Sequence, residues 1–247
     1  VAIVGCGALG GAAALALVRA GVGHLRLIDR DVPEPSNLPR QVLFDEADVA
    51  AGLPKAVAAT RHLERMNSAA RIDPVVADLT PTNVADLLSG HDVVLDGTDN
   101  FEARFIVNEF CCRERVPWVH GGAIGAEGRV LTIVPGVSAC LRCLVPEPPA
   151  PGSLPTCETA GVLGPAVLVV GAVQALEAIR LLAGGPRPGN RLLVCDLWEQ
   201  SWRTVDLTPL AATGCPTCRE GDAPWLEGRS GVRSTVRHDC SQRSQTR

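Results

Sequence analysis

The sequence predicts an α/β protein with a Rossmann-like, mostly parallel sheet that is extended by antiparallel strands. Two observations predict this class. Short apolar runs alternate with helical patterns as far as Gly122, the order expected of parallel strands joined by crossover helices. Beyond that residue, strand-like runs are interrupted by a single long helical pattern, which is typical of antiparallel strands added to the edge of a sheet.

The elements follow in a regular order. The predicted strands of the parallel part are 1–5, 24–29, 71–77, 92–96 and 117–122, and the predicted helices between them are 7–21, 55–67, 81–90 and 101–115. The antiparallel part is predicted at 129–135 and as a pair within 191–208, with a long buried helix over 163–183. The segment PEPPAPGSLP (146–155) has the composition of a mobile loop, and the polar residues 219–247 are expected to be a flexible tail.

Composition excludes several classes of partner. The net charge of −4 and the 3% of aromatic residues give neither a basic stripe nor stacking platforms, so no nucleic acid is expected. The longest apolar run, 162–173, is too short to cross a bilayer, so no membrane is expected. No signal peptide precedes the first strand, which favours a cytoplasmic protein. The chain begins with Val1, so we expect the native start to lie upstream.

A glycine-rich turn follows the first predicted strand. In GCGALG (5–10), Gly5, Gly7 and Gly10 allow a tight turn, and the helix that begins near Ala8 offers N–H groups to a phosphate. Asp29 ends the second strand, 19 residues after Gly10, where a carboxylate would bind a ribose hydroxyl. This pattern indicates an adenine nucleotide but does not distinguish NAD from ATP, and a turn needed only for packing is the other interpretation.

Basic residues after the second strand favour ATP. The loop DRDVPEPSNLPRQ carries Arg40, and Lys55, the only lysine in the chain, opens the next helix. Two cations directed at a phosphate chain suit charge stabilisation at phosphorus and have no role in hydride transfer. Asp99, in LDGTDN, is a candidate magnesium ligand. The alternatives are a surface lysine and a helix N-cap at Asp99 or Asn100.

Nine of the ten cysteines divide into three kinds, and the tenth, Cys240, lies in the polar tail. CLRC and CPTC supply Cys140, Cys143, Cys215 and Cys218, two short-spaced pairs that predict a closed structural zinc site, with a redox dithiol as the alternative. Cys157 stands alone behind the proline-rich loop, where a thiol could reach a substrate. Cysteines within apolar strand or helix patterns are expected to be inert core residues: Cys6, Cys111, Cys112 and Cys195.

Together these motifs resemble the ThiF/MoeB family, the bacterial relatives of ubiquitin-activating enzymes. The resemblance runs from Val1 to about Cys218 and rests on GCGALG, DRD, SNLPRQ, Lys55, DGTDNFEAR, CLRC, TCETAGVLGP and CPTC in this order. It implies a homodimer with a nucleotide-binding half at about 1–135 and a carrier-binding and zinc half at about 136–218. The implied reaction transfers AMP from ATP to the C-terminal glycine of a small ubiquitin-fold sulfur carrier, ThiS-like or MoaD-like. The acyl-adenylate then becomes a thiocarboxylate, with sulfur from a donor protein.

The resemblance also implies roles for individual residues. Asp29 would bind the ribose, Arg40 and Lys55 the phosphates, and Asp99 magnesium, while Cys157 would take part in sulfur transfer. The full implied nucleotide set is Gly5, Gly7, Ala8, Gly10, Asp29, Asp31, Ser36, Asn37, Arg40, Lys55, Asp99 and Asn100, and the four paired cysteines would hold zinc.

Three features depart from the family pattern. Its members usually carry an arginine on an N-terminal helix that would precede Val1, Pro39 stands where glutamine is common, and the interval from Arg40 to Lys55 is about two residues longer than usual. We expect Pro39 to be tolerated in an extended loop and the longer interval to bulge. No rhodanese domain follows, which favours thiazole over molybdopterin synthesis. An NAD-dependent oxidoreductase and a non-catalytic carrier-binding homologue remain as rival interpretations.

Overall fold

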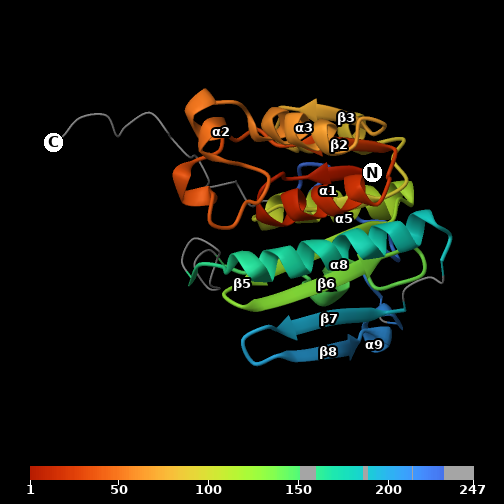
Figure 1. Ribbon diagram of the computed structural model, residues 1–247. Coiled ribbons are helices and arrows are strands. Elements are labelled where there is room, and N and C mark those ends of the chain that lie inside the picture. The colour runs from red at the N-terminus through yellow and green to blue at the C-terminus, as the bar shows by residue number, and fades with distance from the viewer. Residues whose placement is uncertain (151–159, 186–188, 213, 231–247) are drawn as a thin grey trace, which may run out of the picture.

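An eight-stranded mixed sheet forms the centre of the molecule (Figure 1). The structure, a computed structural model, describes residues 1–150, 160–185, 189–212 and 214–230. Within these residues the strand order is β3-β2-β1-β4-β5-β6-β7-β8. The predicted fold class, a parallel core with antiparallel strands added at one edge, is therefore confirmed.

The first five strands are parallel. In all of them except β3 most residues are buried. They are β1 Ala2–Val4, β2 His24–Ile28, β3 Arg71–Val75, β4 Val94–Asp96 and β5 Trp118–Ile124. The chain winds outward from β1 in both directions, to β2 and β3 on one side and to β4 and β5 on the other. Ligands bind at such a switch point, outside the carboxyl ends of the strands, so this edge between β1 and β4 is the place for a nucleotide.

Three antiparallel strands complete the sheet: β6 Glu127–Ile133, β7 Arg191–Asp196 and β8 Ser201–Asp206. Each pairs with the preceding strand in the order predicted from the alternating patterns. Every residue of β8 is exposed, and β8 forms the far edge of the sheet.

Helices cover both faces and enclose two apolar cores. One face carries α1 Ala8–Arg19, α3 Lys55–Met66 and α8 Gly164–Leu182, and the other carries α4 Val84–Leu88 and α5 Phe101–Glu114 with the short α6 Leu141–Leu144 and α9 Thr208–Ala212. Gly171 lets α8 lie directly on α1, since a Cβ atom there would be 2.7 Å from the Cβ atom of Ala12.

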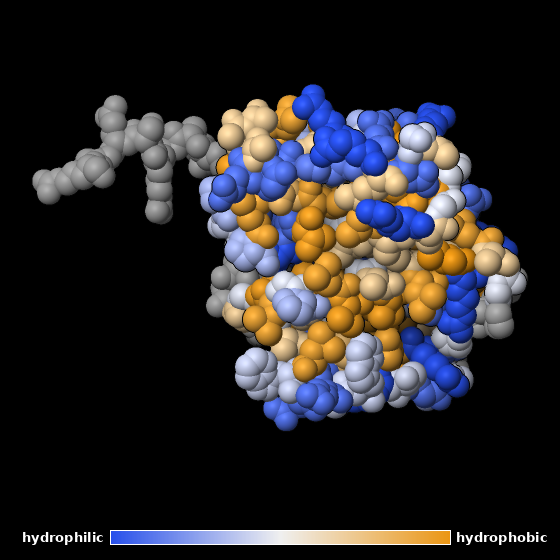
Figure 2. Space-filling view, in the orientation of Figure 1, coloured by the Kyte–Doolittle hydropathy of each residue, from blue (hydrophilic) through white to orange (hydrophobic). Residues whose placement is uncertain are grey.

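By length and composition alone, α8 would be able to span a bilayer. It packs against α1, β5 and β6, as expected of a buried helix of the core. Its outer side nevertheless exposes Leu168, Leu176 and Leu182, and Trp202 of β8 is exposed beside it. Figure 2 shows apolar residues gathered across this side of the molecule. We call these four residues the α8 face.

The interval between Arg40 and Lys55 is partly helical. It holds the short helix α2 Glu46–Ala51 after the 3₁₀ helix η1 Pro35–Asn37. Asp45 caps α2 by accepting from the N–H groups of Ala47 and Asp48, and Gly52 ends it in the left-handed conformation, with φ of +61°. This segment is thus a locally capped helix and not an irregular loop.

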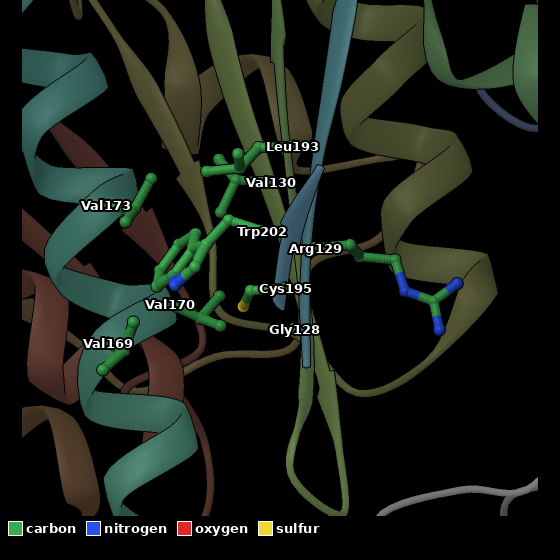
Figure 3. A pocket seen from close by; sticks show the side chains of 9 residues that line it. All are labelled: Gly128, Arg129, Val130, Val169, Val170, Val173, Leu193, Cys195 and Trp202. Atoms are coloured by element: carbon green, nitrogen blue, oxygen red, sulfur yellow. The ribbon is translucent and has the colours of Figure 1, made fainter. Parts of the chain in front are cut away.

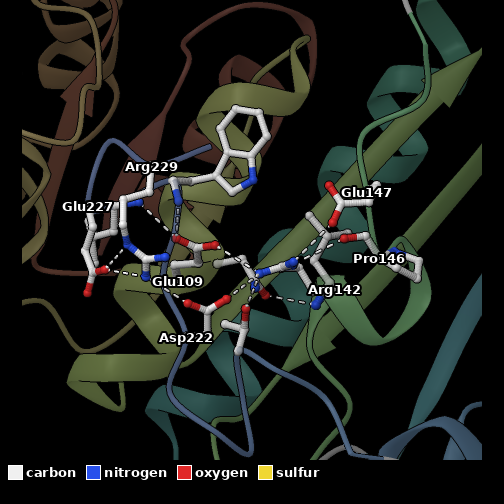
Figure 4. A network of polar contacts seen from close by, with 12 residues as sticks. Glu109, Arg142, Pro146, Glu147, Asp222, Glu227 and Arg229 are labelled. Carbon is white, nitrogen blue, oxygen red and sulfur yellow. Dashed lines mark hydrogen bonds and ion pairs between the residues drawn. The ribbon is translucent and has the colours of Figure 1, made fainter. Parts of the chain in front are cut away.

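The expectation of a flexible tail is wrong for residues 219–230. Trp225 and Leu226 are buried, and the Trp225 ring lies 5.2 Å from that of Phe105 on α5. The buried carboxylate of Glu109 accepts from the backbone N–H groups of Trp225 and Leu226, each at 2.9 Å (Figure 4). The apolar tripeptide Pro224–Leu226 holds this otherwise polar segment against α5. Residues 231–247 lie outside the described part of the chain.

Candidate active site

The predicted phosphate turn has the close packing that its glycines permit. Gly5 has φ of +87°, and a Cβ atom on it would lie 2.6 Å from the carbonyl oxygen of Gly97. A Cβ atom on Gly10 would lie 1.8 Å from the carbonyl oxygen of Gly5. The turn after β1 and the loop after β4 are therefore in backbone contact, which brings GCGALG and DGTDN to one edge of the sheet.

The N-terminus of α1 is free to bind an anion. Gly7 is its N-cap and Ala8 its first residue, and among the described residues no side chain caps it. The first turn holds no acidic residue. The unpaired N–H groups and the positive end of the helix dipole therefore face the carboxyl edge of the sheet, as a phosphate site requires.

Asp29 follows β2 and is tied to the same turn. Its Oδ2 accepts from the N–H of Cys6 at 2.7 Å, and its Oδ1 accepts from the N–H of Asp31 at 2.8 Å. Burial raises the pKa of the Asp29 carboxyl, while the charge of Lys55 and the two N–H groups lower it. Each oxygen keeps a second lone pair for a ribose hydroxyl.

Lys55 is not the surface lysine of the alternative interpretation. It is buried, with 6% of its surface exposed, although it stands at the first position of α3. Its backbone N–H donates to the carbonyl oxygen of Asp31 at 2.7 Å, and its Nζ donates to Oδ2 of Asp31 at 3.2 Å. The predicted residues Asp29, Asp31 and Lys55 thus lie together beside the phosphate turn.

The segment that carries Ser36, Asn37 and Arg40 is held by its own contacts. Arg40 is half-buried, and its Nη1 donates to the carbonyl oxygen of Ser36 at 2.7 Å. The Asn37 side chain is buried and accepts from the N–H of Glu34 at 3.3 Å. Pro39 is exposed in the turn, and its carbonyl packs against the start of α8 at Gly164. Within the described part of the chain, the guanidinium of Arg40 thus binds a carbonyl oxygen and forms no ion pair with a carboxylate.

The sequence left open which of Asp99 and Asn100 caps α5 and which is available to a magnesium ion, and the structure separates these two roles. Asn100 is the N-cap of α5, and its Oδ1 accepts from the N–H of Ala103 at 2.9 Å. Asp99 is exposed, and among the described residues its Oδ1 accepts just one long bond, of 3.4 Å, from Asn100. Because the amide oxygen of Asn100 is used by the helix, Asp99 is the better candidate to bind magnesium.

Sequence reasoning missed two buried polar groups at this edge. Asp96, the last residue of β4, is 1% exposed and forms bonds to Thr98, Arg104 and His120. The Oε1 atom of Gln41 is buried and has no hydrogen-bond partner in the described parts of the chain, and the carboxamide lies beside Gly7. Asp96 lies in the LDGTDN motif. The register of the two parallel strands was the one signal that could have predicted the contact of His120 with it.

The four paired cysteines form one cluster on the α5 side of the sheet. The Sγ–Sγ distances are 3.7 Å for Cys140–Cys215, 3.8 Å for Cys140–Cys143 and 3.6 Å for Cys143–Cys218. A tetrahedral zinc site with Zn–S bonds of about 2.3 Å places its sulfurs about 3.8 Å apart. The cluster therefore fits a closed zinc site.

Polar contacts around the cluster fix its two halves. Asn108 of α5 accepts from the N–H of Leu141 at 2.9 Å and donates to Sγ of Cys140 at 3.7 Å. Arg142, between the first pair of cysteines, donates to Oγ1 of Thr217 at 3.1 Å and lies 3.6 Å from Oε1 of Glu109 (Figure 4). Such contacts align the CLRC and CPTC segments independently of the metal.

Three of the four cysteines predicted to be core residues are buried, and the fourth, Cys112, is not. Burial raises the pKa of the thiols of Cys6, Cys111 and Cys195, as expected of inert core residues. Cys112 is only partly buried and lies near Cys140. Cys157 falls outside the described residues.

An apolar depression on the α8 side is a different feature from this site. Its lining includes Val130 and Leu193 of the sheet and Val169 and Val173 of α8. Figure 3 shows Trp202 reaching from β8 toward α8, whereas Arg129 points to the opposite side of the sheet. None of the predicted nucleotide residues lines it.

Comparison with known proteins identifies the family of this chain. The sequence model described as the ThiF family matches residues 1–217. The chain belongs to the ThiF family. The sulfur carrier protein ThiS adenylyltransferase of Bacillus subtilis is 40% identical over 235 residues, 95% of this chain and 69% of that protein. The SAMP-activating enzyme E1 of Haloferax volcanii is also 40% identical over 235 residues, 95% of this chain and 85% of that protein.

A solved structure confirms the ThiF-type fold. MccB of E. coli, in a crystal structure with ATP, superposes with a TM-score of 0.74 at 24% sequence identity. The superposition covers 88% of this ThiF-family chain and 65% of the MccB chain. The chain thus spans less than two thirds of MccB, and the likeness concerns the fold alone.

Proposed function

We propose that this chain is an ATP-dependent adenylyltransferase that activates the C-terminal glycine of a small ubiquitin-fold sulfur-carrier protein. One observation supports this most strongly: the free N-terminus of α1, Asp29 and the buried Lys55 lie around one phosphate turn in a member of the ThiF family. The names of the two relatives, a ThiS adenylyltransferase and a SAMP-activating enzyme, give the same class of reaction.

The reaction we propose is an adenylyl transfer. A carboxylate oxygen of the carrier's terminal glycine attacks the α-phosphorus of ATP, the bond from that phosphorus to the bridging oxygen breaks, and pyrophosphate leaves. Magnesium, when bound, offsets negative charge on the phosphates. Of this chain's residues, Asp99 would hold magnesium, Asp29 the ribose, and the N–H groups near Gly7 and Ala8 a phosphate.

Arg40 and Lys55 would stabilise the charge that develops in this reaction. The ammonium of Lys55 already lies at a carboxylate, so it can exchange Asp31 for a phosphate oxygen without entering the site from solvent. Arg40, which pairs with no carboxylate among the described residues, would turn from the carbonyl of Ser36. Preorganised cations of this kind act where charge builds up in the transition state.

The same proposal covers sulfur transfer and pathway. Cys157 would act after adenylation, in sulfur transfer or in a covalent bond to the carrier, with sulfur from a donor protein. The ThiS adenylyltransferase among the relatives favours thiamine thiazole synthesis over molybdopterin synthesis. Cys157→Ser should therefore spare adenylation and stop the later step.

Zinc and dimerisation complete the proposal. The cluster of four cysteines fits a structural zinc ion, and the α8 face is where we place the contact between two copies of a homodimer. Leu176 is 61% exposed and Trp202 53% exposed, and Figure 2 shows an apolar patch on this side of the molecule, which is the kind of surface that marks an interaction site. We place the enzyme in the cytoplasm, where ATP is available.

The direct test is the mass of the carrier. Incubation of the protein, MgATP and a Gly-Gly-ending carrier should add one AMP to the carrier's C-terminus, visible by intact-mass spectrometry. A carrier that lacks its last glycine is the matched control and should remain unmodified. NAD binding in preference to ATP would support the oxidoreductase instead, because hydride transfer develops no charge at phosphorus for Lys55 and Arg40 to stabilise.

A further inference from the structure

His120 contacts the loop that carries Asp99 through one buried carboxylate. His120 of β5 and Asp96 of β4 are 6% and 1% exposed. The Nδ1 atom of His120 donates to Oδ2 of Asp96 at 2.6 Å, a short bond to an acceptor. Asp96 is 24 residues away in the chain, so only the fold brings the two together.

The protonation states of the pair follow from their surroundings. Burial opposes ionisation of Asp96, but the charge of Arg104 and the bonds from His120 and Thr98 bring the pKa of its carboxyl below the usual value. Burial lowers the pKa of His120, although Asp96 raises it. The pair is thus a carboxylate and a neutral imidazole, and since a carboxylate only accepts, the proton lies on Nδ1.

The other oxygen of Asp96 determines the path of the next residues. Its Oδ1 accepts from the N–H of Thr98 at 2.8 Å and from Oγ1 of Thr98 at 2.6 Å. Arg104 donates to the carbonyl oxygen of Thr98 at 2.6 Å and lies 3.3 Å from Oδ2 of Asp96. The residue immediately before Asp99 is therefore held at its N–H, its hydroxyl and its carbonyl.

The loop is also fixed against the phosphate turn. A Cβ atom on Gly97 would lie 2.3 Å from the carbonyl oxygen of Gly5 and 2.9 Å from the backbone nitrogen of Gly10. Because Gly97 and Thr98 are both held in this way, the position of Asp96 determines where Asp99 would bind magnesium. Movement of the Asp96 carboxylate would displace Asp99 relative to the phosphates.

The register of the sheet shows why a side chain is needed here. β4 and β5 pair through Val94 with Trp118 and through Leu95 with Val119. Asp96 and His120 come next in this register, where backbone pairing has ended. The bond between their side chains continues the connection at the point where the strand turns into the loop.

We propose that His120 is a positioning residue of the adenylation site, which fixes Asp96 and through it the magnesium-binding position of Asp99. This inference rests on the proposed function, because it assumes that Asp99 meets magnesium bound to ATP. Without His120, the longer contact with Arg104 is the one that Oδ2 of Asp96 keeps among the described residues. The loop then samples positions in which Asp99 cannot reach the metal.

The experiment measures magnesium dependence of ATP binding. Fluorescent ATP is titrated into the zinc-loaded protein at increasing magnesium concentrations and, separately, in magnesium-free buffer without a chelator. His120→Ala should raise the half-saturating magnesium concentration about tenfold, the scale of one hydrogen bond to a charged group, with ATP binding in the absence of magnesium unchanged. His120→Asn, whose side-chain N–H₂ lies near the position of Nδ1, should recover most of the loss.

Gln174→Ala is the matched structural control. Gln174 of α8 donates to the carbonyl oxygens of Asp96 at 2.8 Å and Val119 at 3.2 Å, so it also bridges β4 and β5 but does not contact the Asp96 carboxylate. It should leave the half-saturating magnesium concentration unchanged. An equal magnesium shift in Gln174→Ala, or none in His120→Ala, would overturn the inference. Failure of the wild-type protein to bind MgATP would overturn the proposed function itself.

Discussion

The Nζ atom of Lys55 lies 3.2 Å from Oδ2 of Asp31, in a pair whose two members differ sharply in exposure. The Lys55 side chain is 8% exposed and the Asp31 side chain is 56% exposed. A buried ammonium needs a partner, and here that partner lies on the solvent side, where a bound phosphate could replace it. The only lysine of the chain is thus held at the site by a contact that a ligand can exchange.

Lys55→Ala should therefore abolish adenylation. We expect carrier-dependent AMP transfer to fall at least about 100-fold, since removal of one group that stabilises transition-state charge has this effect. The zinc content should not change. Arg61→Ala is the control, because Arg61 is an exposed cation on the same helix and should keep wild-type activity. Wild-type rates of AMP transfer in Lys55→Ala would refute the assignment of this residue.

The cysteine cluster should bind one zinc ion per chain. Cys143→Ser removes one of four ligands, so we expect loss of zinc by elemental analysis and faster proteolysis of the segment after Cys215, which the metal would hold to CLRC. Cys195→Ala, at a buried cysteine outside the cluster, should retain the metal. A wild-type protein that is free of zinc after expression in zinc-rich medium would contradict this prediction.

Glu109 should make stability depend on pH. Burial raises the pKa of its carboxyl from 4.5 to about 7, although the N–H of Leu226, the charge of Arg142 and the N–H of Trp225 lower it. Between pH 4.5 and about 7, Glu109 keeps its proton in the folded protein but has released it in the unfolded chain. The contribution of Glu109 to the free energy of unfolding should therefore decrease as pH rises from 4.5 to 7, by at most about 3 kcal/mol, and stay constant above.

Glu109→Gln tests that sign, because the amide remains neutral at every pH. The difference in unfolding free energy between wild type and variant, measured by urea denaturation, should change across this pH window and level off above pH 7. Glu114→Gln changes an exposed carboxylate of the same helix. Its curve of unfolding free energy against pH should be parallel to that of the wild type. Parallel curves for Glu109→Gln as well would show that the carboxyl titrates normally.

Leu176→Glu should dissociate the proposed dimer. Leu176 is 61% exposed on α8, and a charge placed at the centre of an apolar contact is costly to bury. Sedimentation velocity should show a dimer for wild type and a monomer for the variant. Arg113→Glu, at an exposed site on the opposite side of the sheet, should stay dimeric. A monomeric wild type would show that the α8 face is not a dimer contact.

Much of the fold could be predicted from the sequence because its signals are local. The order of strands and helices, the glycine turn and the two cysteine pairs depend on periodicity and on spacings of a few residues. Lys55 also stood out, as the only lysine at the start of a helix. The burial that distinguishes it from a surface lysine was visible only in the structure.

Features that depend on distant partners could not be predicted in this way. Trp225 docks because α5 presents Glu109 and Phe105, more than 100 residues earlier in the chain, so a polar composition gave the wrong expectation. His120 meets Asp96 only through the register of two strands. In α2, a cap at Asp45 and a left-handed glycine formed a helix too short for its periodicity to be recognised.

The measurement that tests the central claim most directly is ATP–pyrophosphate exchange, with magnesium present and a panel of sulfur carriers that end in Gly-Gly. We expect pyrophosphate exchange that depends on one carrier, requires Lys55 and persists in Cys157→Ser. Absence of exchange with every carrier, from a zinc-loaded protein that includes the family's N-terminal arginine, would contradict it.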